Sequence, residues 1–579
     1  MPLGSSLNSL LLLAKNLDTS KPTTYTGKKG KNDKPFVYPK EKGIISLPRG
    51  NISDSGYSKE YIDSFFNELY SDLSIRPNRI LLVKGNKVIA ERYCKPYARD
   101  SWDCVFSTSK TLVGLALGLL YDDGLVDLDK PVVKILGIEK NVHIARNRKI
   151  TLRHLLTMST GITFNEMESA SSTKWVKSFF ESNSKFKLGT KFEYNSMNTY
   201  IISACVEKLA GKKFKDLVVE RIFNPLHAND IHIDTSLEGY FIGGWGLYIL
   251  PEDMAKLGIL VRDGGMYDGK QIISKEWIDM MSHTQYEATQ FGHVLNYGFQ
   301  MWADDKNNFC CFNGMYDQNI MIYRNSGVIV VTCCANSEAF HGGNLFKICA
   351  KYFAKKEPGK FELCSNRGYR DLKNYDEFMY YYDYLQDKEY KPIYKIANSC
   401  GILPLILQNE LGTYAKGIKS VKFKKEGDTY ALIINEGHKE YLLKFDFKDG
   451  IRDTYEFYGN KFDCAISARF ILSGKSEIFL VIRMFFLEFS SSRYFTIKFG
   501  KDKDIISMEL SENPGLGFVY SVIEVQDETA KAIFAGITKT LNPAYQSGII
   551  KNIFSPSFRL VHGEAKYRKL KGEKIKEIS

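Results

Sequence analysis

The sequence predicts an α/β domain built on an antiparallel sheet flanked by helices, followed by a separate all-β domain. Two observations predict the first part: a helix and a strand hairpin at residues 58–93, and a group of strands followed by a helix at 308–356. A third observation predicts the second part, because apolar and polar residues alternate with a period of two from about residue 405 to the end.

The α/β domain has the same kinds of element at its two ends. Residues 58–73 place their apolar side chains on one helical face. Residues 79–85 and 87–93 are strand-like runs joined through a Gly-Asn turn, which is typical of a hairpin. Residues 150–260 indicate mostly helices and loops, and 308–335 return to strands. One domain, with a helical middle between its strand-forming ends, accounts for this order.

We therefore expect four segments along the chain. They are an extended N-terminal segment at 1–50, the α/β domain at 51–356, a connecting region at 357–404 and a barrel-like β-domain at 405–579. The first segment is basic and interrupted by Pro and Gly, and the connecting region is rich in Tyr, Asp and Lys. Neither has the periodic apolar pattern of a packed domain.

Composition and charge restrict the classes of function. The chain has 579 residues, of which 44% are hydrophobic, so it can bury large cores. The formal net charge is +12, but its Lys and Arg residues are spread along the chain, which favours a solvated surface. No nucleic-acid-binding motif accompanies this charge, and no stretch reaches the roughly 18 apolar residues that span a bilayer. We expect neither a nucleic-acid partner nor stable membrane insertion.

The cysteines indicate a reducing compartment. There are 11, without a C-x-x-C pair. The adjacent pairs Cys310–Cys311 and Cys333–Cys334 lie in strand-like runs, where neighbouring side chains point to opposite faces and make poor disulfides or metal clusters. The apolar run at residues 10–14 is too short for a signal peptide and has no basic region before it. We expect a cytoplasmic protein, with secretion as the less favoured alternative.

The strongest chemical signal is Ser107-Thr108-Ser109-Lys110, an S-x-x-K motif that opens an apolar helix. A serine at a helix N-terminus and a lysine one turn later share a face, so the lysine can take the serine proton once burial favours its neutral form. Backbone N–H groups at the same helix end can stabilise an oxyanion. The S-x-x-K matches at Ser171/Lys174 and Ser182/Lys185 lie in polar stretches without such a helix. An N-capping serine with an ordinary lysine is the non-catalytic alternative for Ser107 and Lys110.

The region around this motif resembles the serine β-lactamase-like hydrolases, which include penicillin-binding DD-peptidases, class C β-lactamases, related esterases and 6-aminohexanoate-dimer hydrolase. The resemblance runs from about Gly56 to Lys355 and implies a β-lactamase/transpeptidase-like fold. Its landmarks, in family order, are VFSTSKTLVGLALGLLYDDGLVDLD, ITLRHLLTMSTGI, LGTKFEYNSMNTYIISACVEKLAG, NPLHANDI, GYFIGGWGLYILPEDMAKLGIL and YGFQMW. The C-terminal β-domain is similar to small barrel-like domains appended to some members of this family.

The resemblance assigns roles to a second motif, Tyr194-Asn195-Ser196, with Asn198 two residues further on. It implies that Tyr194 works with Lys110 to move the proton to and from Ser107; a packed core tyrosine is the alternative. It also implies that Ser196 and Asn198 form hydrogen bonds near the substrate.

The third motif departs from the family pattern. By position, the K-x-G or H-x-G of the family falls on Phe312-Asn313-Gly314, where the basic residue is missing. The resemblance implies that Gly314 admits the substrate to the strand edge and that the N–H of Met315 is the second oxyanion donor beside that of Ser107. The chain lacks the cation that holds a substrate carboxylate in the family, which argues against penicillins. Literal matches at His341 and Lys28 are out of order along the chain.

A few other side chains are candidates for lining the substrate pocket, for its rim, or for a structural role near it. Trp302 is a candidate wall of the pocket. His283 and His293 are candidate rim residues, with packing or surface histidines as the favoured alternative. His154 is interpreted as structural.

The leading hypothesis is a serine hydrolase that acts through an acyl-enzyme on a small ester, amide or peptide, without a metal or organic cofactor. One alternative is a β-lactamase or DD-peptidase proper, which nitrocefin turnover would support. Another is a catalytically inactive binding module, motivated by the missing basic residue. Retention of Ser107, Lys110 and Tyr194 together argues against the binding module. The expected partner is a small-molecule substrate, and the sequence makes no prediction of oligomeric state.

Overall fold

The computed structural model describes residues 43–578 except 170–171, 337–342, 360–377, 394–400, 405–406, 409–414, 416, 474–476 and 515–554. The chain divides into two compact units, one within residues 26–369 and the other within 370–579. Most of the predicted N-terminal segment, the serine of the Ser171/Lys174 motif, Lys28 and His341 lie outside the described residues.

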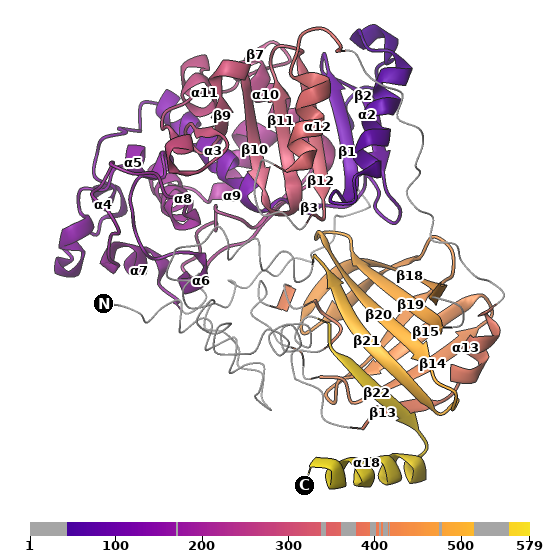
Figure 1. Ribbon diagram of the computed structural model, residues 1–579. Helices are drawn as coiled ribbons and strands as arrows, with labels where there is room; N and C mark the ends of the chain where they lie inside the picture. The colour runs from indigo at the N-terminus through magenta and orange to yellow at the C-terminus, as the bar shows by residue number, and fades with distance from the viewer. Residues whose placement is uncertain are drawn as a thin grey trace. The chain divides into compact units, whose positions relative to one another are not determined.

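The first unit is centred on a seven-stranded antiparallel sheet (Figure 1). Its order is β2 (Lys87–Tyr93), β1 (Pro77–Lys84), β12 (Val328–Cys334), β11 (Gln318–Tyr323), β10 (Phe309–Gly314), β9 (Trp302–Asp304) and β8 (Asn296–Tyr297). Strands from the two ends of the domain sequence meet at β1 and β12, which pair over most of their length. The fold prediction for this part of the chain is confirmed.

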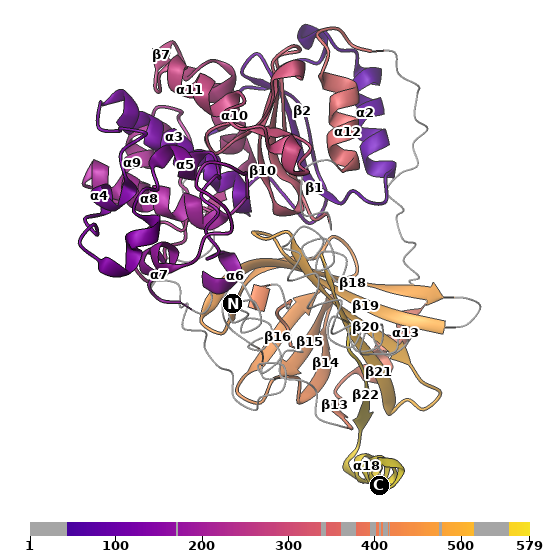
Figure 2. The ribbon, with the colours of Figure 1, turned by 60° about the vertical axis from the view of Figure 1, so that its left-hand side comes forward.

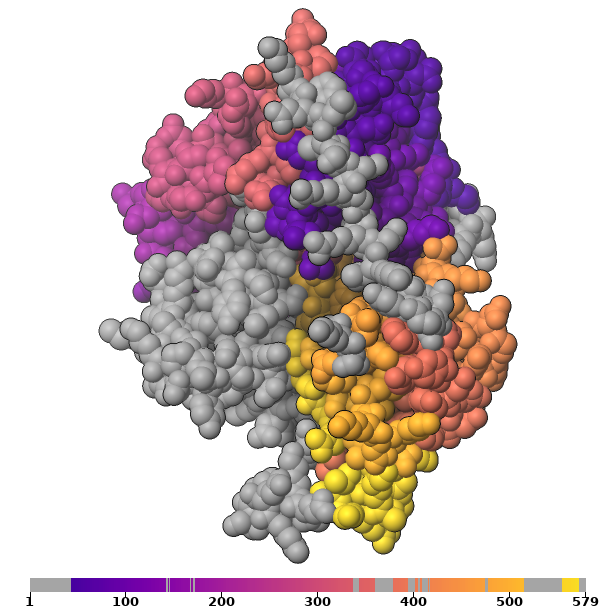
Figure 3. Space-filling view, turned by 45° about the vertical axis from the view of Figure 1, so that its right-hand side comes forward, coloured from indigo at the N-terminus to yellow at the C-terminus, as the bar shows by residue number. Residues whose placement is uncertain are grey.

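Helices cover both faces of this sheet because its strands alternate apolar side chains between two cores. Cys310, Phe312 and Cys333 lie on the face shared with α3 (Ser109–Asp122), α8 (Ser196–Ala210) and α10 (Pro251–Arg262). Cys311 and Cys334 lie on the face covered by α2 (Lys59–Ser71) and α12 (Asn344–Phe353). Neither adjacent cysteine pair can therefore close a disulfide. In the space-filling view, the indigo residues near the start of the unit lie beside the salmon residues near its end (Figure 3).

The predicted helical middle gathers beside the sheet (Figure 2). It also contains α5 (Leu152–Leu156), α6 (Glu166–Ser169), α7 (Trp175–Glu181) and α9 (Phe214–Val218). The helices α4 (Val132–Leu136) and α11 (Lys275–Ser282) lie just outside the predicted range of 150–260. A three-stranded sheet crosses this region: β3 (Asp103–Cys104), β5 (Leu247–Ile249) and β4 (His232–Ile233). It ties the segment just before the S-x-x-K motif to the chain around residue 248.

The second unit is a ten-stranded antiparallel sheet that curls into a nearly closed barrel. Its order is β16 (Glu440–Phe445), β15 (Thr429–Asn435), β14 (Ser420–Glu426), β13 (Glu389–Pro392), β22 (Ser557–His562), β21 (Ile505–Asn513), β20 (Ser491–Phe499), β19 (Glu477–Phe486), β18 (Asn460–Ser473) and β17 (Ile451–Phe457). Asp446, just after β16, bridges to Ser467 on β18 and brings the two ends of the sheet together. The expectation of a C-terminal all-β part is confirmed.

This unit begins earlier than the alternating pattern indicates. The helix α13 (Tyr380–Leu385) and strand β13 lie within the stretch expected to connect two domains. Tyr390 of β13 pairs with β14 on one side and with β22 on the other, so the strand is internal to the sheet. A four-residue strand is too short to give a visible period of two, which explains why the sequence pattern does not reveal it.

Candidate active site

Ser107 lies in a tight turn immediately before α3, within the 3-10 helix Phe106–Thr108. Among residues 101–110 it is the one side chain that is not buried. Phe106 adopts a left-handed conformation with φ of 47°, which is unusual for a residue with a side chain. Its ring packs edge-on against Tyr316 with 5.1 Å between centroids. The turn therefore presents the serine hydroxyl outward from an otherwise buried segment.

Lys110 is buried in the first turn of α3 and reaches back to this serine. Its Nζ lies 2.7 Å from Ser107 Oγ and also 2.7 Å from the carbonyl oxygen of Gly244. Burial lowers the pKa of Lys110 to about 7, and the Glu166 carboxylate acts in the opposite direction. A lysine with this pKa is partly neutral near pH 7, so its amine can accept the Ser107 proton.

Tyr194 lies over the same lysine. Its ring centroid is 4.8 Å from Lys110 Nζ. The ring also stacks on Trp302, with 5.5 Å between the two ring centroids. Burial raises the pKa of Tyr194, while a hydrogen bond with Ser107 lowers it. The phenol is therefore protonated at neutral pH, in contact with both members of the S-x-x-K motif. The structure brings all three predicted catalytic residues together.

The third motif lies beside the serine turn because Gly314 has no side chain. A Cβ at this position would be 2.3 Å from the carbonyl oxygen of Val105, two residues before Ser107. Thr108 Oγ1 donates to the carbonyl oxygen of Gln318 at 2.6 Å and fastens β11 to the same turn. Met315, which follows β10 directly, is half-buried at this junction. Its N–H remains the predicted second oxyanion donor.

The turn from β10 to β11 is held in an uncommon conformation. Tyr316 and Asp317 have φ values of 62° and 63°, which strain the backbone of residues with side chains. The buried Asp317 carboxylate accepts hydrogen bonds from Asn336 at 2.6 Å and from Asn319 at 3.2 Å. These hydrogen bonds stabilise the strained turn and fix the backbone around Met315.

Phe312, at the position where the sequence resemblance places the basic residue of the third motif, is a core side chain. It is 1% exposed and belongs to the same apolar cluster as the side chains of α3. Its neighbour Asn313 donates to Asn319 at 2.6 Å. No basic side chain takes the place of the missing one within the described part of this strand, Phe309–Gly314.

The predicted substrate-binding residues divide into two groups. Ser196 starts α8 next to the site but is 3% exposed, and Trp302, also 3% exposed, lies behind Tyr194. Asn198 is fully buried, accepts a hydrogen bond from Thr160 at 2.7 Å and donates to Met158 at 3.3 Å. Asn198 has no exposed surface through which it could reach a substrate, so its place in this structure is that of a core residue.

The histidines take up structural positions. His154 completes a capping box with Thr151 at the start of α5, as the sequence interpretation indicates. His293 packs against Phe192 and Trp302, with ring centroids 5.0 and 5.3 Å apart. His283 ends α11, and its Nδ1 is 3.0 Å from the carbonyl oxygen of Asp279.

Two contributors to the site escape sequence reasoning. Gly244 supplies the carbonyl that Lys110 contacts, and Glu166 supplies a carboxylate that influences both Lys110 and Tyr194. The sequence GGWG at 243–246 is a visible signal for a tight backbone approach, since a Cβ at Gly244 would be 2.5 Å from that of Ser196. Glu166 has no comparable signal.

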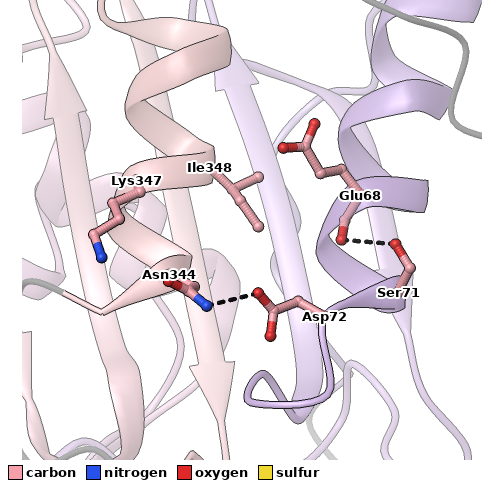
Figure 4. A pocket seen from close by; sticks show the side chains of 6 residues that line it. All are labelled: Glu68, Ser71, Asp72, Asn344, Lys347 and Ile348. Atoms are coloured by element: carbon pink, nitrogen blue, oxygen red, sulfur yellow. Dashed lines mark hydrogen bonds between the residues drawn. The ribbon is translucent and has the colours of Figure 1, made fainter.

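Other surface features lie away from these residues. One hollow of about 410 Å³ is lined by Glu68, Ser71 and Asp72 of the α2 end and by Asn344, Lys347 and Ile348 of α12 (Figure 4). Asn344 donates to Asp72 across it at 2.8 Å. Among the described residues, no three His, Cys, Asp or Glu side chains gather as metal ligands. In that same part of the chain, no helix is long and apolar enough to cross a membrane.

Comparisons with known proteins identify the family of the first unit. Residues 75–342, which contain every predicted site residue, match the family model described as beta-lactamase. The chain contains a domain of the serine β-lactamase-like hydrolase family. The family predicted from the sequence motifs is therefore confirmed.

Individual relatives of this β-lactamase-family domain are distant. The 6-aminohexanoate-dimer hydrolase of Paenarthrobacter ureafaciens is 26% identical over 220 residues, which is 34% of this chain and 55% of that protein. The chain thus spans about half the length of this relative. A penicillin binding protein from Bacillus halodurans is 17% identical with a TM-score of 0.38, covering 51% of this chain and 98% of that one. A family VIII carboxylesterase is 14% identical with a TM-score of 0.42, covering 52% and 98%.

Proposed function

We propose that the β-lactamase-family domain is a serine hydrolase that acts through an acyl-enzyme on small esters, amides or peptides. The observation that carries this proposal is the 2.7 Å contact between Lys110 Nζ and Ser107 Oγ, in a site where burial brings the pKa of the lysine to about 7. A general base needs both hydrogen-bond reach and a pKa near the working pH.

In the proposed reaction, Ser107 Oγ attacks the substrate carbonyl carbon as its proton passes to the neutral Lys110. The oxyanion that forms is stabilised by the N–H groups of Ser107 and Met315; one such donor is typically worth about 3–4 kcal/mol of barrier. Tyr194 relays the proton to the leaving alcohol or amine, and the acyl group stays on Ser107. Water, deprotonated by the same pair, then attacks the ester and releases the acid.

The shape of the third motif supports a restricted substrate class. With Phe312 turned into the core, β10 offers no cation to a substrate carboxylate. Penicillins and peptidoglycan stems present such a carboxylate and lose that ion pair here. The similarity to a protein named 6-aminohexanoate-dimer hydrolase supports including linear amides among the candidates.

A panel of ester, amide and β-lactam substrates tests the proposal. We expect turnover of p-nitrophenyl esters or linear amides by the wild type above the background of Ser107→Ala, with much weaker turnover of nitrocefin. Nitrocefin turnover as fast as ester turnover would instead support a β-lactamase proper. Wild-type protein that is folded and equal to Ser107→Ala on every substrate would contradict enzyme function.

The pH dependence of the Ser107 reaction follows from the protonation state of Lys110. Below pH of about 7 the lysine is increasingly protonated and cannot accept the serine proton. The rate of labelling by a fluorophosphonate should therefore rise with pH through about 7 and then level off. Tyr194, with its raised pKa, remains protonated across this range. A rate that falls over pH 6–8 would contradict the assignment of Lys110 as the base.

A further inference from the structure

Glu166 links α6 to the start of the helix that carries the second motif. Its Oε1 accepts the backbone N–H of Ser196, the first residue of α8, at 2.9 Å. That N–H is one of the groups a helix leaves unsatisfied at its N-terminus, and a carboxylate is a favourable partner for it. Tyr194 precedes Ser196 by two residues, so the bond also fixes the segment that carries the phenol.

The same carboxylate acts on the charge of the site. It opposes the effect of burial on Lys110 and adds to the effect of burial on Tyr194. A buried lysine without a nearby anion is pushed further towards its neutral form. One side chain therefore bears on the position of Tyr194 and on the protonation of Lys110, although it belongs to none of the three motifs.

We propose that Glu166 is a positioning residue that anchors the Tyr194 segment and balances the charge of Lys110. This inference rests on the proposed function, in which Lys110 is the base for Ser107. Glu166 acts through these groups and does not itself exchange protons with the substrate. Its loss should change the pH at which the serine becomes reactive, an effect that a purely structural hydrogen bond would not produce.

Other titratable groups lie around Tyr194 and Lys110, and each has its own contacts. Glu193, next to Tyr194, pairs with Lys185 at 2.8 Å. Tyr297 on β8 lies behind Tyr194, and burial raises its pKa well above the usual range. The pKa of His293, which packs on Trp302, is lowered by burial from its ordinary value of 6.5. On the β10–β11 side, the Asp317 carboxylate is held by Asn336.

Two substitutions separate the charge of Glu166 from its hydrogen bond. Glu166→Gln keeps an oxygen for the Ser196 N–H but removes the charge. Glu166→Asp keeps the charge but shortens the side chain. Glu168→Gln is the matched control, because it removes a carboxylate from the same short helix, and Glu166 is the carboxylate that acts on the pKa of Lys110.

The measurement is the rate of fluorophosphonate labelling of each full-length variant between pH 5 and 9. Without the anion the pKa of Lys110 falls, so the midpoint of the rise in rate should move to lower pH in Glu166→Gln, by about 0.5–1 unit. In Glu166→Asp the midpoint should stay near the wild-type value while the rate falls. Glu168→Gln should match the wild type in both respects.

Each outcome has a distinct meaning. An unshifted midpoint in Glu166→Gln, with or without a lower rate, would overturn the proposal. If Glu166→Gln does not fold, the Glu166→Asp variant decides. A midpoint equal to that of the wild type together with a lower labelling rate would support the proposal. A labelling rate equal to that of the wild type would overturn it. Failure of the proposed function has another signature, because the wild type itself would then not be labelled at any pH.

Discussion

Replacing Ser107 with alanine should abolish covalent labelling by a fluorophosphonate and reduce ester or amide turnover to the background level. The substitution removes only the hydroxyl group, which is the proposed nucleophile. Because Ser107 is partly exposed at the end of a turn, its loss leaves no large cavity. We expect the melting temperature to stay close to that of the wild type, so the loss is one of chemistry.

The matched control is Ser182→Ala, in another S-x-x-K sequence of the chain. Ser182 donates to the carbonyl oxygen of Phe179 at 3.0 Å, and Lys185 is an exposed residue paired with Glu193. Lys185 is exposed there, so burial does not favour the neutral amine that a base for Ser182 would need. Labelling should be unchanged in this variant, and peptide mapping of the labelled wild type should find the adduct on Ser107. An adduct on any other serine would count against the assignment.

Replacing Lys110 with methionine should lower the labelling rate and turnover by about 10²–10⁴-fold, which is the usual contribution of a general base. Methionine is close to lysine in length and keeps the packing of the first turn of α3. The variant loses the amine that contacts Ser107 and Gly244. A labelling rate within about threefold of wild type would exclude Lys110 as the base.

In the Lys110→Met variant, we expect the free energy of unfolding to rise although the activity falls. The pKa of Lys110 is about 7 in the folded protein, whereas that of an exposed lysine is 10.5, so folding is opposed by the cost of neutralising or burying the ammonium. This cost is fully present below pH 7 and disappears as the pH rises towards 10.5. Lys110→Met should therefore be more stable than wild type by about 1–3 kcal/mol near pH 6, after the lost hydrogen bonds are counted. Denaturant unfolding at pH 6 and pH 10 checks that the gain shrinks with pH.

The sequence predicts the parts of the site that depend on short spacing. Ser107 and Lys110 are three residues apart, in the 3-10 turn before α3 and in the first turn of α3, so their contact follows from local helical geometry. The alternation along 308–335 likewise predicts that Cys310 and Cys311 face different cores, because strand geometry is also local.

The parts that depend on tertiary packing escape such reasoning. Glu166 is 56 residues from Lys110 along the chain and reaches the site through a four-residue helix that has no periodic pattern. Asn198 has the spacing of a motif residue, yet it lies in the first turn of α8 on the side that faces Thr160 and Met158. Family spacing locates a residue along the chain but does not determine whether its side chain is exposed. β13 illustrates the same point for the fold, since its identity as a strand comes from its two neighbours.

The pairing of β1 with β12, and the placement of Gly314 against the serine turn, have a consequence for biosynthesis. A ribosome adds about 5–20 residues per second, so Met315 emerges about 10–40 s after Ser107. In the proposed mechanism, the nascent chain would during that interval carry its nucleophile and base without the turn that holds Met315, the proposed second oxyanion donor. A ribosome-bound chain stalled before residue 315 should therefore be inert towards acylating reagents, and reactivity should appear only after the last strands of the sheet have left the exit tunnel.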